Sequence, residues 1–320
     1  MLSLRERLSG ALLDRVAGPH GHSIRDRIHG TPGDRWFGPD APLRRVHGDA
    51  SMFVGGLAAL LLQSWHPRAM VAVAAHSGYR GDPWGRLQRT SAFLAVTAFG
   101  TADHAGQATR AVRQIHAGIS GFSEDGEPYA ASDPHLLRWV HVAEVHAFLT
   151  AHQRFGARPL SAADCDLYVA QAARTARELG VIDPPESVRE LRAQLDGFVP
   201  ELRGSAAARD AATFLLREPP LPVAARLPYR GLVLAAIGLL PRACREPLGL
   251  PDRVWVDRDI APALGQFLTA TIRWALAAQP PPPTPDEPGA PASAHPAPVP
   301  QPPAASEPAD EESGPARPHA

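Results

Sequence analysis

The chain has 320 residues, of which 44% are hydrophobic and 20% charged, enough apolar mass for one large domain or two small ones. Its formal net charge of −1 lacks the basic excess of nucleic-acid-binding proteins, so no nucleic-acid partner is expected. All 32 basic residues are arginine, which excludes Schiff-base chemistry by a lysine and a lysine-bound pyridoxal cofactor.

The cysteines, the first residues and the apolar runs indicate the cellular location that we expect for the protein. Cys165 and Cys244 form no CxxC pair, zinc motif or haem-attachment motif, so we expect both to be free core residues in a reducing compartment. The first residues lack the basic-then-apolar layout of a secretory signal, which favours a cytoplasmic location. The longest apolar run, residues 51–65, is shorter than the roughly 20 residues that span a bilayer, so no transmembrane segment is expected.

Helical periodicity and capping residues dominate residues 1–278. Gly100 is expected to end one helix and Thr101 to cap the next, while Asp133-Pro134 combines a capping side chain with proline at the first helical position. Only the segment around Asp125-Gly126 predicts a strand pair, a small hairpin over residues 122–129. The sequence therefore predicts an all-α, multi-helix fold. The predicted helices cover residues 57–63, 86–99, 101–120, a segment opening at 133–134, then 161–179, 186–196, 205–217, 229–241 and 257–278.

The composition changes abruptly at Gln279. Residues 279–320 hold 15 of the chain's 35 prolines, mixed with alanine, serine and acidic residues. Proline donates no backbone hydrogen bond and the stretch has little apolar surface to bury, so it is predicted to be a disordered Pro/Ala-rich tail. A polyproline ligand for an unknown partner is the alternative interpretation.

A cationic cluster lies at the start of the helix predicted over residues 86–99. Arg86, Arg89 and Thr90 are spaced i, i+3 and i+4, so a helix presents them on one face. Two guanidinium groups and a hydroxyl suit carboxylates or a developing oxyanion. The simpler interpretation is that these arginines form surface ion pairs with nearby aspartates.

Two later helices carry histidines at the edge of apolar surfaces. His116 borders the apolar stripe of its helix, where an imidazole nitrogen could bind a haem iron or the side chain could be an ordinary boundary residue. His141 and Glu144 are spaced i, i+3 on the side of the helix that is expected to be buried. Such a pair could support a metal ligand, relay protons or form a satisfied core contact. His66-Pro67 is expected to form a turn between helices, with a pocket wall as the second interpretation.

Several common catalytic motifs are missing from the sequence. The chain has no ExxH of ferritin-like di-iron proteins, no HExxH, GxSxG or GxGxxG motif and no Walker loop. An Asp-rich metal motif of terpene synthases is likewise absent.

The order of short motifs over residues 44–250 resembles the MpaB-type oxygenase family, which is similar to the catalytic domain of rubber-cleaving latex clearing proteins. The resemblance rests on Gly48-Asp49, residues 59–63, His66-Pro67, residues 82–90, residues 99–101, His116, Tyr129, Asp133-Pro134, Leu137, residues 139–141, residues 166–168 and residues 239–241.

This resemblance implies a globin-related, all-α core with additional helices that holds haem b non-covalently through an axial histidine. It implies that His116 is that metal ligand, with His141 as the second candidate, and that Arg86, Arg89 and Thr90 form the catalytic face, Arg86 also contacting the cofactor. It divides the chain into an N-terminal, partly helical extension (1–43), an oxygenase-like catalytic domain (44–278) and the tail (279–320).

The sequence departs from the latex-type pattern at two points. Arg89 stands where those enzymes have lysine, and no glutamate lies between Glu6 and Glu124 to act as the family's distal base. Asp82, Asp49 or His76 would have to replace it. Without an export signal, cleavage of extracellular rubber is not expected, and a smaller apolar substrate such as an isoprenoid or unsaturated lipid fits better.

Three hypotheses follow from the sequence. The first is a haem b-dependent oxygenase, an oxidoreductase acting with dioxygen on that apolar substrate. The second is a non-catalytic helical haem or lipid carrier, because a missing distal base leaves binding intact. The third is a helical interaction protein without a cofactor, whose Pro-rich tail recruits a partner.

Overall fold

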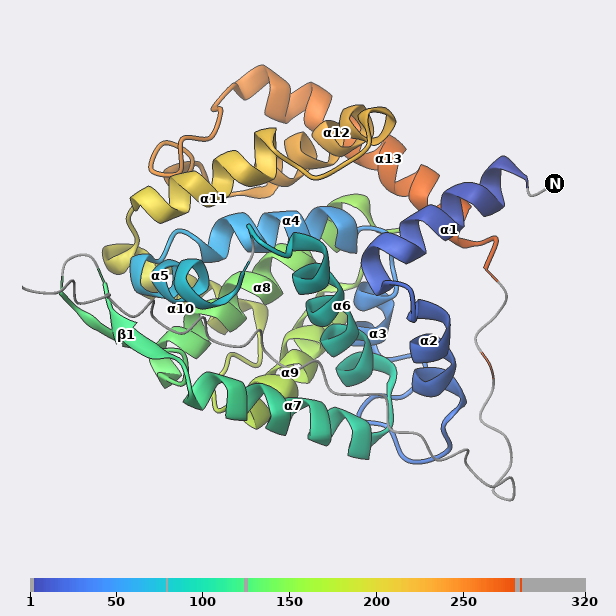
Figure 1. Ribbon diagram of the computed structural model, residues 1–320, viewed down its shortest axis with the longest axis horizontal. Helices are drawn as coiled ribbons and strands as arrows, with labels where there is room; N and C mark the ends of the chain where they lie inside the picture. Colours follow the sequence, from blue (N-terminus) through green and yellow to red (C-terminus); the bar gives the residue numbers. More distant parts are fainter. Residues whose placement is uncertain (1–2, 79, 124–125, 280–282, 284–320) are drawn as a thin grey trace, which may run out of the picture. The chain divides into compact units, whose positions relative to one another are not determined.

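The computed structural model describes residues 3–78, 80–123, 126–279 and 283. Thirteen α-helices and one short hairpin account for the regular structure of these residues, which confirms the all-α fold class (Figure 1). The predicted tail lies outside the described residues, apart from Gln279 and Pro283. Within the described part of the chain, no helix is both long enough and apolar enough to cross a bilayer.

The elements are, in chain order, α1 (Leu4–Ala17), α2 (Gly21–Gly30), α3 (Pro42–His47), α4 (Met52–Gln63), α5 (Pro67–His76), α6 (Pro83–Phe99), α7 (Ala102–Ala117), β1 (Ser120–Phe122), β2 (Pro128–Ala130), α8 (Pro134–Phe155), α9 (Ala162–Leu179), α10 (Val188–Phe198), the 3₁₀ turn η1 (Val199–Glu201), α11 (Ala206–Arg217), α12 (Val223–Leu239), η2 (Arg242–Cys244), the π-turn η3 (Val256–Ile260) and α13 (Ala261–Leu276).

Side-chain caps set the helix starts that the sequence signalled. Thr101 accepts a hydrogen bond from the His104 amide at the start of α7, and Asp133 accepts one from the His135 amide at the start of α8. Ser161 does the same for α9, which ends at Gly180 with φ of 98°, a left-handed conformation that glycine adopts without steric cost. These three predicted helix starts are confirmed.

Two predicted boundaries were wrong. Helix α12 begins at Val223 rather than at residue 229, so Pro228 lies inside it. The carbonyl that Pro228 leaves without a donor belongs to Ala224, which is exposed, so water can replace the missing bond. The hairpin extends further than the predicted residues 122–129, because it pairs Ser120 with Ala130 and Phe122 with Pro128.

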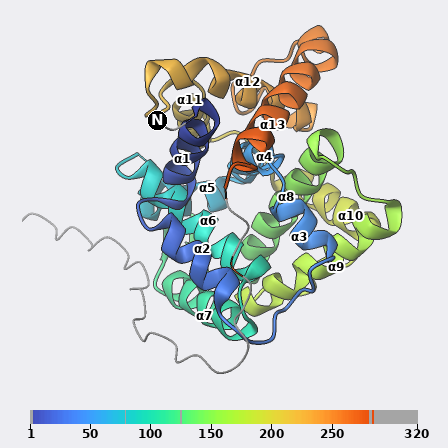
Figure 2. The same ribbon diagram turned by 90° about the vertical axis from the view of Figure 1, so that its right-hand side faces the viewer.

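The core is built around α4, which packs between α8 on one side and α12 on the other, while α13 packs against α12 and also contacts α8 and α4 (Figure 2). Gly55 makes the contact between α4 and α8 close, because a Cβ there would lie 3.2 Å from both the Ala151 and Phe148 side chains. Cys165 and Cys244 are free and buried in this core, as predicted. Helix α9 packs against α3, α7 and α8, and the candidate site lies along these contacts.

Candidate functional site

Helix α8 brings a histidine and a glutamate into the protein interior. Burial lowers the pKa of His141 to about 4, with a smaller contribution from Arg177, so its ring is neutral at pH 7. Burial also raises the pKa of Glu144 to about 7, and this carboxyl has no hydrogen-bond partner among the described residues. A buried carboxyl without a partner is costly to ionise, so Glu144 can hold a proton near neutral pH.

Tyr168 lies close to Glu144, and His47 in turn lies beside Tyr168. The His47 ring, at the end of α3, lies with its centroid 6.1 Å from that of Tyr168 on α9. Burial raises the pKa of Tyr168 well above its usual value and the charge of Glu144 adds to this, which places the two groups close together. Burial lowers the pKa of His47 to about 4. We call His47, His141, Glu144 and Tyr168 the α8 polar cluster.

The α8 polar cluster is unusual because several of its buried polar atoms lack partners. His47 Nδ1, His141 Nε2 and Tyr168 Oη make no hydrogen bond within the described residues. Such orphaned groups are rare in native interiors unless a ligand, an ion or water satisfies them. The cluster is therefore a candidate binding site, although Tyr168 is fully buried in the hydrophobic core.

His116 lies near the C-terminal end of α7, which packs against both α6 and α9. Its Nδ1 is buried without a hydrogen-bond partner in the described part of the chain, and burial lowers the pKa of the ring. A neutral imidazole with an unused nitrogen is the form that binds a metal ion. His116 and His141 each have a buried ring nitrogen without a partner in the described residues, and both remain candidate ligands.

The cationic face of α6 lies near the surface. Arg89 forms an ion pair of 3.2 Å with Asp82, and 38% of its side chain is exposed. Thr90 is exposed and Arg86 is half-buried. Asp82 also caps α6, so a backbone hydrogen bond from Gly85, and then Arg89, lower the pKa of its carboxyl. The Arg89–Asp82 contact is the ion pair that the simpler interpretation of this cluster predicted.

The candidate substitutes for a distal base all have other partners. Asp82 is occupied as just described, and His76 Nε2 lies 3.1 Å from Tyr129 Oη. Burial alone would raise the pKa of Asp49, but hydrogen bonds from Arg273, Ser51 and Ala157 leave it below its usual value. Glu144 differs from all three, because it is enclosed and has no such partner.

The fold and the site can now be compared with known proteins. A family described as "ER-bound oxygenase mpaB/B'/Rubber oxygenase, catalytic domain" matches residues 44–274. The chain belongs to this MpaB/Lcp oxygenase family. A solved structure titled "Structure of Latex Clearing Protein LCP in the closed state" is similar over 86% of this chain and 88% of that one, with 18% identity and a TM-score of 0.50. A search of curated protein sequences gave no match.

The likeness to the latex clearing protein structure shows that the two proteins share a fold, and it assigns no role to any residue of this chain. The α8 polar cluster and His116 fit a haem group in one respect. They supply neutral imidazoles whose buried nitrogens have no partner among the described residues. The ligand and catalytic roles of His116, His141, Arg86, Arg89 and Thr90 remain predictions.

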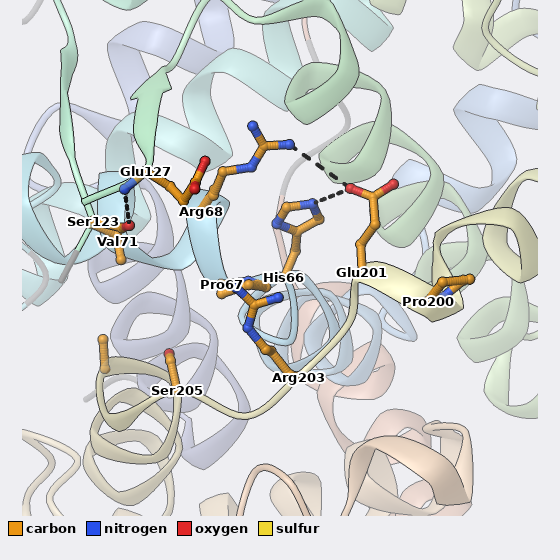
Figure 3. Close-up of a pocket in the computed structure, with 11 residues that line it drawn as sticks. His66, Pro67, Arg68, Val71, Ser123, Glu127, Pro200, Glu201, Arg203 and Ser205 are labelled. Atoms are coloured by element: carbon orange, nitrogen blue, oxygen red, sulfur yellow. Dashed lines mark hydrogen bonds and ion pairs between the residues drawn. The ribbon is translucent and has the colours of Figure 1, made fainter. Parts of the chain in front are cut away.

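Sequence reasoning missed part of the α8 polar cluster and one other site. Tyr168 and His47 were visible only as residues near family motifs, because nothing local shows that α3, α8 and α9 meet. The other site is a pocket of about 370 Å³ bordered by His66 and Glu201, which lie 135 residues apart in sequence (Figure 3). His66-Pro67 was considered as a pocket wall, and the structure places it there.

Proposed function

We propose that this chain is a haem b-dependent oxygenase that uses dioxygen to oxidise a small apolar substrate, such as an isoprenoid or another unsaturated lipid. Membership of an oxygenase family supports the reaction class. The single observation that supports the cofactor is the presence of neutral imidazoles, His116 and His141, whose buried nitrogens have no partner in the described residues. An unpaired buried nitrogen costs stability unless the protein uses it to bind something.

In this proposal His116 would hold the haem iron, with His141 as the alternative. When bound, haem supplies a redox-active iron at which dioxygen can be activated. Arg86 and Arg89, on the partly exposed face of α6, suit the anionic propionates, which can stay hydrated there. Thr90, the third member of that face, can add a hydroxyl hydrogen bond.

Glu144 takes the role of the missing distal base in this scheme. Its pKa of about 7 is close to the pH at which a general base both accepts and releases a proton readily. Tyr168, whose hydroxyl lies close to this carboxyl, can orient it through a hydrogen bond.

The ligand assignment is tested by comparing His116→Ala and His141→Ala with His22→Ala, an exposed histidine on α2. Haem content after purification from haem-supplemented cells should fall at least tenfold in the axial-ligand variant, because the iron loses its protein bond. We expect this loss for His116→Ala and near-normal haem content for His22→Ala. Full haem retention with unchanged spectra in His116→Ala would remove that residue from the role.

A non-catalytic haem or lipid carrier is the second candidate. The exposure of Thr90 and the pairing of Arg89 with Asp82 favour it, because both reduce what this face can contribute to chemistry. An oxygen electrode separates the two functions. An oxygenase consumes dioxygen when an unsaturated lipid is added, whereas a carrier binds the lipid without consumption.

A further inference from the structure

A second group of potential ligands lies outside the α8 polar cluster. His66 is the residue before α5, His135 lies in the first turn of α8 and Glu201 ends η1. Their ligand atoms all lie within 4.8 Å of one another. Three separate segments thus bring two imidazoles and one carboxylate together, and two of these residues, His66 and Glu201, also line the pocket in Figure 3.

The three side chains already interact, His135 with Glu201 at hydrogen-bond distance and His66 with Glu201 at a slightly longer distance. His135 Nε2 lies 2.9 and 2.8 Å from the two carboxylate oxygens of Glu201, and His66 Nε2 lies 3.4 Å from Oε2. Zinc bonds of about 2.0–2.1 Å at tetrahedral angles separate neighbouring ligand atoms by about 3.3 Å. Small side-chain shifts would therefore bring all three groups to a common ion.

His66 supplies an independent indication that something binds here. Its side chain is only 1% exposed, its Nδ1 makes no hydrogen bond within the described part of the chain, and its Nε2 faces the Glu201 carboxylate at 3.4 Å. Figure 3 shows His66 and Glu201 pointing toward each other beside the pocket.

An aromatic wall fixes the two histidines. The Phe198 ring lies 4.8 Å from that of His135, and Trp139 lies 5.9 Å from His66 and 5.3 Å from Phe198, all between centroids. Trp139 is itself held by a hydrogen bond to the Gln63 carbonyl. Ligands pre-positioned in this way lose little side-chain entropy when they bind an ion.

The chemistry of the donor set suits a catalytic type of metal site. Two histidines and one carboxylate leave at least one coordination position open, as in zinc hydrolases and non-haem iron enzymes. Here the pocket of about 370 Å³ lies beside the group and could give water or a small ligand access to that position. Arg68 lies 3.9 Å from Glu201, and its charge moderates that of the carboxylate.

This group is distinct from the predicted haem ligands. His141 follows His135 by six residues on α8, which corresponds to about 9 Å along the helix axis and a direction about 120° away around it. We propose that His66, His135 and Glu201 form a mononuclear site for a divalent transition-metal ion, with Zn²⁺ as the simplest occupant. The site would exist whether or not the chain binds haem.

Calorimetric titration of the full chain with Zn²⁺ after chelator treatment tests the proposal. We expect one tight site per chain. His135→Ala and Glu201→Gln should each weaken it by at least about 100-fold, since even outer-shell partners of a metal ligand are worth about 10- to 100-fold. These two residues are half-buried, so their replacement spares the buried His66 on which local packing depends.

His22→Ala, at an exposed position, is the matched control and should bind Zn²⁺ as the unmodified chain does. Co²⁺ titration with absorption spectra gives a second readout, since ligand-field bands should appear in the unmodified chain and disappear in His135→Ala. The proposal is overturned if no tight site is found, or if both ligand variants bind with unchanged affinity. Haem spectra of these variants report the proposed oxygenase function separately.

Discussion

At the scale of single residues, Glu144 is the group whose chemistry departs most from that of an ordinary core side chain. It lies on α8 close to the unpaired hydroxyl of Tyr168 on α9, and the His47 ring lies beside that tyrosine. Native proteins keep such groups where function needs them, because replacement by apolar side chains of similar volume often stabilises a fold. The α8 polar cluster is therefore interpreted as functional.

The raised pKa of Glu144 has a direct consequence for stability. Between pH 4.5 and about 7 the unfolded chain has lost this proton while the folded protein keeps it, so the contribution to stability falls as pH rises through this window. From a shift of this size the loss above pH 7 is on the order of 3 kcal/mol. Glu144→Gln should thus match the unmodified chain near pH 4.5 and exceed its unfolding free energy at pH 8.

Urea unfolding at a series of pH values measures this difference. His47 and His141, whose pKa values are lowered to about 4, also make stability depend on pH, because their contribution to the unfolding free energy rises up to about pH 6.5. Both proteins share this contribution, so the difference between the variant and the unmodified chain isolates Glu144. Parallel stability profiles for the two proteins would show that the Glu144 carboxyl is not buried as described.

Individual residues also mark the limit of inference from sequence. His141 and Glu144 could be paired from their spacing, because both lie on one helix and the helical period is known. Tyr168 and His47 could not be added to them, because their meeting depends on how α3, α8 and α9 pack. The group of His66, His135 and Glu201 was invisible for the same reason.

At the scale of elements, the contact between α4 and α8 sets the centre of the fold. The backbone of Gly55 approaches α8 so closely that the Cα of Phe148 would lie 3.3 Å from a Cβ at that position. Gly56, the next residue, has open space at the corresponding point. The two adjacent glycines therefore separate the effect of close packing from that of helix propensity.

Gly55→Leu should destabilise the protein by about 1–3 kcal/mol, the usual cost of overpacking a core, even though leucine favours helix more than glycine does. Gly56→Leu should leave the unfolding free energy unchanged or raise it slightly. Thermal or urea unfolding of the two variants tests this difference. Equal stability would contradict the close α4–α8 contact.

Helix boundaries were predictable where a side chain caps the helix. Thr101, Asp133 and Ser161 each accept the expected backbone hydrogen bond, an interaction that depends only on residues nearby in sequence. The start of α12 was misplaced because Pro228 is tolerated inside the helix, and that tolerance depends on the exposure of Ala224 in the folded protein.

At the scale of the whole molecule, an all-α architecture is retained at 18% identity to the latex clearing protein structure. Helical period and capping are enough to predict that architecture, and the order of motifs is enough to predict the family. The roles of individual side chains are less constrained. With arginine at position 89 and no glutamate between Glu6 and Glu124, we expect the catalytic groups to be arranged differently within a common fold.

The most direct test of the haem assignment is the absorption spectrum of the full chain purified from haem-supplemented cells, recorded before and after dithionite. We predict a strong Soret band that shifts on reduction, with close to one haem per chain. A colourless protein that also fails to bind added haem would contradict the oxygenase mechanism, while leaving the fold and the family in place.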